Sequence, residues 1–261
     1  MTSLRPGTAL LLCLAATACS GDLAFDDDLD VGVGADSIEG TAQTQALLSV
    51  SSDAAMGAIG AEMAATVAAQ NSGTFFQPMG CLATQRDGAT VVYTFTNCTG
   101  PYGLVNLNGT VRATFSNVTP TSRTVAVTGE LRANRFTLRP NASAQITYMG
   151  TTRLATVTLM GGGTSPRGNT WTNTGTYMST WNGTCLGLSG RVSSTANGAS
   201  VTVDVSNYNR CRGGCPDAGG RVTVTSSRGA SVSVSYSGGA TATLTGTRGR
   251  SSTIALYCGA T

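Results

Sequence analysis

The sequence contains no histidine and no lysine in 261 residues. Without histidine the chain has no imidazole to act as a base beside a serine or cysteine nucleophile, or to bind a metal ion. Without lysine it has neither the lysine of a P-loop nor an amine for a Schiff base. Charged residues make up only 11% of the chain, against roughly 25% in an average soluble domain. These absences exclude several large classes of enzyme and leave structural and binding roles open.

The first residues have the pattern of an export signal. Arg5 is followed by an apolar run from Ala9 to Ala16 and then by small residues up to Cys19. The run is too short to span a membrane, which takes about 20 apolar residues. Residues 1–18 are therefore predicted to be a signal peptide.

The four residues Ala16-Thr17-Ala18-Cys19 resemble the lipobox of bacterial lipoproteins. In that family the cysteine receives a diacylglycerol group and becomes the N-terminus, so the resemblance implies a lipid anchor on Cys19. Ala16 departs from the usual leucine. By analogy with the family, Ser20 after the cysteine implies the outer rather than the inner membrane of the cell envelope. The alternative is an ordinary secretory signal, which exports the chain with Cys19 unmodified.

Charge is segregated along the chain. Residues 20–71 contain nine acids and no base, whereas residues 72–261 contain fifteen arginines and four acids. Residues 19–43 are rich in glycine and aspartate with few large apolar side chains, so they are expected to form a flexible acidic tether. The acidic segment also offers the basic body a partner within the same chain.

The spacing of apolar residues predicts one helix followed by an all-β body. Residues 44–72 are rich in alanine, with larger apolar residues at helical spacing. From residue 73 to 261 apolar and polar residues alternate, as in Val91, Tyr93 and Phe95, and glycine turns separate the runs. We expect a dozen or more antiparallel strands in a sandwich or a barrel-like meander.

Six cysteines lie beyond the signal: Cys81, Cys98, Cys185, Cys211, Cys215 and Cys258. An even number in an exported β domain predicts three disulfides. Cys81 and Cys98 are about equally distant from the Asp87-Gly88 turn, as Cys185 and Cys211 are from Asn197-Gly198, so each pair should meet across a hairpin. This leaves Cys215 to pair with Cys258. The alternative is a zinc site formed by the last four cysteines, although their spacing lacks a CxxC pair.

The two predicted hairpins are similar in sequence, which indicates two duplicated β units at about residues 80–160 and 184–258. Gly88-Ala89-Thr90-Val91 corresponds to Gly198-Ala199-Ser200-Val201; chance similarity between strands rich in glycine, threonine and valine is the alternative. The run from Tyr93 to Gly103, together with Ser206-Asn207-Tyr208 and Arg210-Cys211, resembles uncharacterised lipoproteins of myxobacteria. The resemblance covers about residues 75–258 and implies an envelope lipoprotein without indicating an activity.

Three sets of residues are candidates for a functional site. The scattered arginines of the body would bind anionic polysaccharide, lipopolysaccharide or DNA through phosphate or carboxylate groups. A pair of carboxylates would be needed for hydrolysis, and the body has only Asp87, Glu130, Asp204 and Asp217. Trp171, Tyr177 and Trp181 share one strand phase and form either a sugar platform or part of the core.

We therefore expect a lipid-anchored, disulfide-stabilised β-protein with a structural or binding role in the bacterial envelope rather than an enzyme. An arginine-based binder of anionic glycans is the first alternative, and a carboxylate-dependent hydrolase is the second. No motif indicates a cofactor, a metal site or specific nucleic-acid recognition. The sequence leaves the oligomeric state open.

Overall fold

The computed structural model describes residues 33–196, 199–211, 214–227, 229–246, 249–256 and 258. The predicted signal peptide and Cys19 therefore lie outside the described residues. Helix α1 (Val33–Ala54) comes first, followed by α2 (Ala61–Asn71) and the short 3₁₀ helix η1 (Ser72–Phe75). Neither helix in the described part is long and apolar enough to span a membrane.

Fifteen strands follow the helices and form one antiparallel sheet. They are β1 (Leu82–Asp87), β2 (Thr90–Cys98), β3 (Leu107–Ser116), β4 (Ser122–Ala133), β5 (Phe136–Arg139), β6 (Asn141–Met149), β7 (Thr152–Leu159), β8 (Gly162–Thr164), β9 (Thr170–Trp181), β10 (Cys185–Ala196), β11 (Ala199–Cys211), β12 (Arg221–Ser226), β13 (Ser231–Tyr236), β14 (Thr241–Thr245) and β15 (Ser251–Ala255). The predicted all-β antiparallel class is confirmed, and the strands form a single sheet rather than a two-sheet sandwich.

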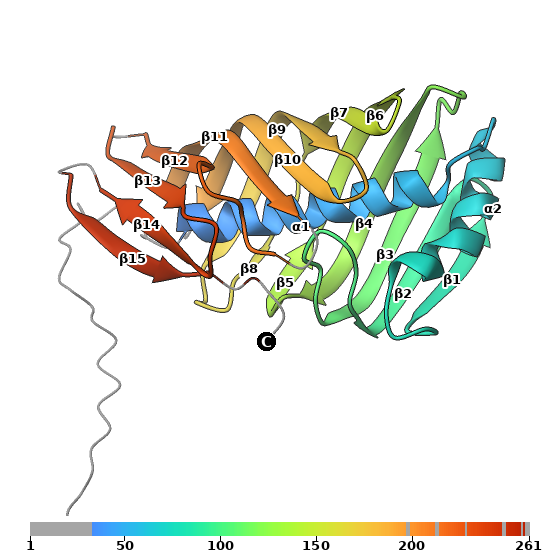
Figure 1. Cartoon of the computed structure of the whole chain (residues 1–261), viewed down its shortest axis with the longest axis horizontal. Helices are drawn as coiled ribbons and strands as arrows, with labels where there is room; N and C mark the ends of the chain where they lie inside the picture. Colours follow the sequence, from blue (N-terminus) through green and yellow to red (C-terminus); the bar gives the residue numbers. More distant parts are fainter. Residues whose placement is uncertain are drawn as a thin grey trace, which may run out of the picture.

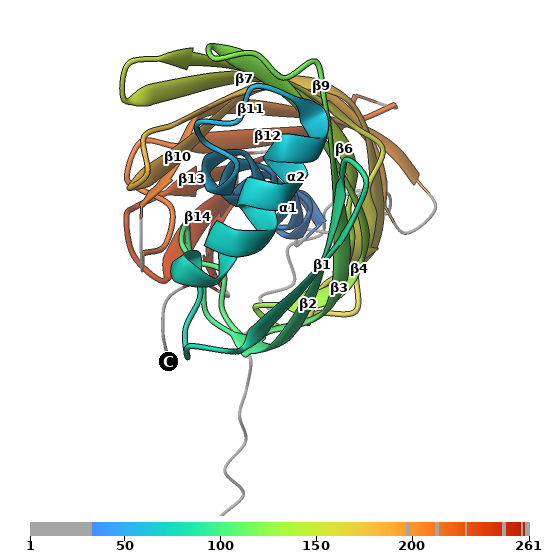
Figure 2. The ribbon, with the colours of Figure 1, turned by 90° about the vertical axis from the view of Figure 1, so that its right-hand side faces the viewer.

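The sheet curls around α1 (Figures 1 and 2). Its strand order is β1-β2-β3-β4-β5-β8-β9-β10-β11-β12-β13-β14-β15, and the β6–β7 hairpin bridges β4 and β9 by a second route. β4 is long enough to pair with β6 along its first part and with β5 near its end. β9 likewise pairs with β8 near its start and with β7 along the rest of its length. The view along the molecule in Figure 2 shows α1 inside this curl and α2 across one end.

Period-two alternation gives the sheet a buried inner face and a polar outer face. Val91, Tyr93 and Phe95 are at most 4% exposed and point inward, as the sequence predicts. The inner face packs on α1, so the helix and the sheet share one core. Burial of this apolar inner face against the helix is the main contribution of the hydrophobic effect to the stability of the fold.

Two segment boundaries predicted from the sequence are wrong. Residues 33–43, predicted to belong to the flexible tether, form the first half of α1, where Asp36 and Glu39 are buried. The single helix predicted for residues 44–72 is two helices, because the chain turns at Gly57 with a φ of 83°. The tether prediction failed because the polar partners of α1, Arg167 in the β8–β9 loop and Arg210 on β11, are more than 100 residues away.

The two segments predicted to be duplicated share the order of their first four strands but differ beyond them, because β4 pairs with both β5 and β6 whereas β13 to β15 continue in sequence. In each, four consecutive strands pair in sequence, β1 to β4 and β10 to β13. In each, a disulfide closes the first hairpin. Common ancestry of the two units stays a prediction.

Candidate functional site: the buried helix and the outer face of the sheet

Helix α1 is buried along its length although many of its side chains are polar. The buried polar residues of α1 are Asp36, Ser37, Glu39, Thr41, Gln43, Thr44, Gln45, Ser49, Ser51 and Ser52. A buried polar group is costly unless it forms hydrogen bonds. The inner face of the sheet supplies partners, for example Asn173 for Ser37 and Tyr177 for Gln45.

In the first half of α1, Glu39 forms an ion pair with Arg210 of β11. Arg210 is fully buried and also donates to the carbonyl oxygens of Gly214 at 3.0 Å and Gly103 at 3.3 Å. Burial works to lower the pKa of Arg210, but Glu39 and Tyr208 together outweigh it and the pKa is raised. Tyr208 lies beside the pair, and burial raises the pKa of its phenol.

At the N-terminus of α1, Asp36 forms an ion pair with Arg167 and accepts a 2.8 Å hydrogen bond from Asn169. A carboxylate is favourable here because the helix dipole is positive at this end. Arg167 also donates to the carbonyl oxygen of Ala255 in β15. The β8–β9 loop thereby ties the last strand of the sheet to the helix.

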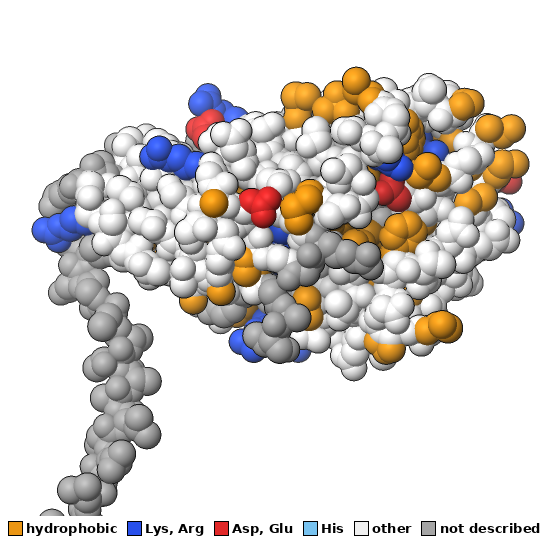
Figure 3. Space-filling model, viewed as in Figure 1, with side chains coloured by type: hydrophobic (Ala, Val, Ile, Leu, Met, Phe, Trp, Pro, Cys, Tyr) orange, Lys and Arg blue, Asp and Glu red, His pale blue; other side chains and the backbone are white. Residues whose placement is uncertain are grey.

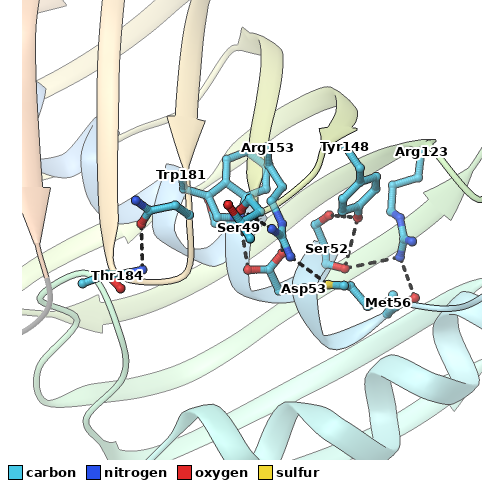
Figure 4. A network of polar contacts seen from close by, with 12 residues as sticks. Ser49, Ser52, Asp53, Met56, Arg123, Tyr148, Arg153, Trp181 and Thr184 are labelled. Carbon is cyan, nitrogen blue, oxygen red and sulfur yellow. Dashed lines mark hydrogen bonds and ion pairs between the residues drawn. The ribbon is translucent and has the colours of Figure 1, made fainter.

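At the other end of α1, Asp53 accepts hydrogen bonds of 3.1 Å from both Arg153 and Trp181 (Figure 4). Burial raises the pKa of Asp53 above 3.8, although Arg153 and Trp181 both oppose the shift. The guanidinium group of Arg123 donates to the carbonyl oxygen of Ala55 at 2.6 Å. A cation at this position stabilises the free carbonyl groups of a helix C-terminus.

The three ion pairs join the acidic segment of the chain to its basic body. Asp36, Glu39 and Asp53 come from the segment with no basic residue, and each binds an arginine of the sheet. The contact between acidic arm and basic body that the sequence suggested therefore exists inside the protein. Each of the three carboxylates has an arginine partner in the interior, so these ion pairs hold α1 in place.

The four carboxylates of the body do not form a catalytic pair. Asp87 ends β1, Glu130 pairs with Arg139 on the outer face, and Asp204 pairs with Arg191 on β10. Asp217 follows β11 and accepts a 2.5 Å hydrogen bond from Asn209. No two of these carboxylates share a hydrogen-bond or ion-pair partner among the described residues.

The aromatic platform predicted as one alternative does not exist. Trp171, Tyr177 and Trp181 are 3%, 5% and 2% exposed, so they belong to the core. The Trp171 ring lies against Gly40 of α1 and Gly163 of β8, where a Cβ atom would overlap it. Burial under the helix, rather than sugar binding, explains why the three side chains share one face.

The exposed arginines do not gather into one patch. Arg139 and Arg191 have carboxylate partners. Arg112 and Arg132 share the outer face but are four residues apart along the ladder, about 13 Å. Charged side chains are scattered over the face shown in Figure 3. Arg212, Arg228 and Arg248 lie outside the described residues. Arg132 and Arg139 are diagonal neighbours on the outer face, because Arg132 pairs with Thr137 and Leu131 pairs with Leu138. Binding of an anion by the arginines stays a prediction.

A shallow groove crosses the outer face of β9, β10 and β11. It has a volume of about 370 Å³ and is lined by Met178, Thr180, Gly187, Leu188, Ser189, Asn207, Tyr208 and Asn209. None of these residues is charged. Sequence reasoning missed the groove because its walls come from three strands; the only local signals were a glycine in a strand and the Ser206-Asn207-Tyr208 motif.

All three predicted disulfides form: Cys81–Cys98, Cys185–Cys211 and Cys215–Cys258. The alternative zinc site is therefore wrong, because its four cysteines are paired with one another as disulfides. Elsewhere in the described part of the chain, no three potential ligands among cysteine and acidic side chains gather as a metal site would require.

No protein-family model, curated protein or solved structure matches this chain.

Proposed function

We propose that this chain is an exported protein of the bacterial cell envelope, anchored by a lipid on Cys19, whose folded body binds or supports other envelope components rather than catalysing a reaction. The observation that carries the proposal is the set of three disulfides. Disulfides persist in oxidising compartments and are rare in the cytosol. The lipobox resemblance of residues 16–19 supplies the anchor.

Two further observations support a binding or structural role. Asp36, Glu39 and Asp53 of α1 form ion pairs with arginines, and these pairs hold the helix within the curled sheet. The described carboxylates of the body lie apart, on the end of β1, on β4, on β11 and after β11. A rigid sheet with a polar outer face is a suitable scaffold for a binding surface.

The anchor is tested by expressing the full chain in a Gram-negative host that is fed radiolabelled palmitate. The intact sequence should incorporate label and fractionate with the outer membrane, whereas Cys19→Ser should incorporate none. Cys13→Ser, within the predicted signal, is the matched control and should be labelled normally. An unlabelled intact chain would refute the lipid anchor.

The compartment is tested separately by alkylating thiols in the native protein before and after reduction. We expect no reactive thiol among the six cysteines of the body before reduction and six afterwards. Six free thiols in freshly isolated protein would contradict export to an oxidising compartment.

A further inference from the structure

The geometry of the outer-face groove points to a binding site for a neutral saccharide, formed by β9, β10 and β11. This inference names a ligand class for the proposed binding role and rests on that role. The groove has a volume of about 370 Å³, within the range of roughly 300–1,000 Å³ that is typical of small-ligand sites. Three local features of the chain build it.

The first feature is a glycine in the middle of a row of larger side chains. Gly187 of β10 lies between Thr180 of β9 and Asn209 of β11 in the ladder. A Cβ atom on Gly187 would lie 2.8 Å from the Thr180 hydroxyl oxygen. Because Gly187 has no side chain, the Thr180 hydroxyl lies over the floor of the groove, with Asn209 on the opposite side.

The second feature is a β-bulge next to that row. Leu188 pairs with Tyr208 and Gly190 pairs with Val205, so Ser206 and Asn207 together oppose Ser189. Asn207 has a φ of 51°, in the left-handed region that residues other than glycine adopt infrequently. A bulge redirects side chains and is often found beside a functional site. Here it accompanies two exposed side chains at the groove, Ser189 and Asn207.

The third feature is that side chains of the segment from Ser206 to Cys211 point to opposite faces of the sheet and have different roles. Tyr208 and Arg210 point inward and are needed to hold Glu39. Asn207 points outward, and its side chain has no hydrogen-bond partner among the described residues. Contacts with Glu39 explain why Tyr208 and Arg210 point inward, whereas the Asn207 side chain has contacts to offer only in the groove.

The β1–β2 and β10–β11 hairpins differ in the segment that forms the groove. In the first, Asn97 also has a φ of 51° and Cys98 follows it directly, but its two-residue bulge is in the pairing of β2 with β3 rather than within the hairpin. In the second, three residues separate Asn207 from Cys211, so the hairpin is longer beyond its bulge. These extra residues and their partners on β10 form the groove. The β1–β2 hairpin lacks this extension.

The chemistry of the lining selects the ligand class. Thr180 and Ser189 offer hydroxyl groups, Asn207 offers an amide that both donates and accepts, and Met178 offers an apolar contact. Charged groups beside the groove are not part of its lining: Asp217 binds Asn209, Arg191 binds Asp204, and Arg221, which lies opposite Ser206 in the ladder, donates to the Ser233 hydroxyl. A phosphate or carboxylate ligand would find no free cation in the lining. A saccharide can match these hydroxyl and amide groups without bringing a charge.

The test is binding of the purified protein, including α1 and carrying its native disulfides, to neutral hexasaccharides of glucose, mannose, galactose and N-acetylglucosamine by titration calorimetry. Heparin is the anionic comparison. We expect at least one neutral hexasaccharide to bind with an affinity that does not change between low and high salt, because no ion pair is involved.

Gly187→Val fills the floor of the groove and should weaken that binding by about tenfold or more. Its backbone φ lies outside the left-handed region, so the strand backbone accepts a β-branched residue, and the Thr180 hydroxyl, 2.8 Å from the added Cβ, must turn away. Ser193→Val, on the outer face of the same strand but outside the groove, is the matched control and should bind normally. Asn207→Gly keeps the left-handed backbone while removing the amide, and it should also weaken binding.

Three results would each overturn the inference. The first is no binding to any neutral hexasaccharide at millimolar concentration, and the second is binding to heparin alone. The third is equal binding by Gly187→Val and the unmodified protein. Circular dichroism of each variant separates loss of the groove from loss of the fold. The palmitate experiment is independent of these results, so the anchor and the groove can fail separately.

Discussion

Glu39 and Arg210 lie 171 positions apart in the sequence but form an ion pair in the interior. Breaking a buried pair leaves one charge without a partner in a poorly solvated site, whereas an exposed pair contributes little because water screens it. Arg210 is fully buried, but in the Arg139–Glu130 pair both side chains are more than half exposed. The two pairs should therefore respond very differently to the same substitution.

Replacing Glu39 with glutamine should lower the free energy of unfolding by about 3–5 kcal/mol, because Arg210 keeps its charge and loses its counter-ion. Glu130→Gln is the control and should cost no more than about 1 kcal/mol. Urea unfolding followed by circular dichroism measures both. Equal effects of the two substitutions would show that the buried pair is not as the structure describes it.

At the scale of elements, α1 is a polar helix that is enclosed by the curled sheet, and the two are in tight contact at Gly40. Gly40 faces the Trp171 ring, which also packs on Gly163 of β8. A glycine in a helix interior is normally a weakness of about 1 kcal/mol relative to alanine. Here it allows the helix to approach an aromatic ring of the sheet.

Gly40→Ala should therefore destabilise the protein by about 1–3 kcal/mol through overpacking, the opposite of what helix propensity alone predicts. Gly73→Ala in η1, where an added Cβ meets nothing within 4 Å, is the matched control and should be close to neutral. Thermal unfolding distinguishes the two. An increase in the melting temperature of Gly40→Ala would contradict the described packing of α1.

At the scale of the whole molecule, the sheet is open, with β1 and β15 as its two edges. The Cys215–Cys258 disulfide encloses β12 to β15, and Arg167 ties β15 to the helix. The disulfide spans 43 residues, whereas Cys81–Cys98 spans only 17. A longer closed loop removes more entropy from the unfolded chain.

Replacing Cys215 and Cys258 together by serine should cost about 1 kcal/mol more stability than replacing Cys81 and Cys98 together, on the loop-entropy argument. Both double variants should lose about 2–5 kcal/mol. Denaturant unfolding of the two variants under identical conditions checks the order. A larger loss for the 17-residue loop would mean that local packing, rather than loop entropy, decides the contribution of these disulfides.

The sequence by itself determined what depends on local pattern. Alternation with a period of two identified the strands, and equal distances from a turn identified which cysteines face each other, because neighbours in an antiparallel hairpin are fixed by the turn between them. Only the tertiary structure decided the place of α1, the partners of Asp36 and Glu39, and the groove at Gly187. These depend on residues brought together from distant strands when the sheet curls, and no local pattern encodes that curl.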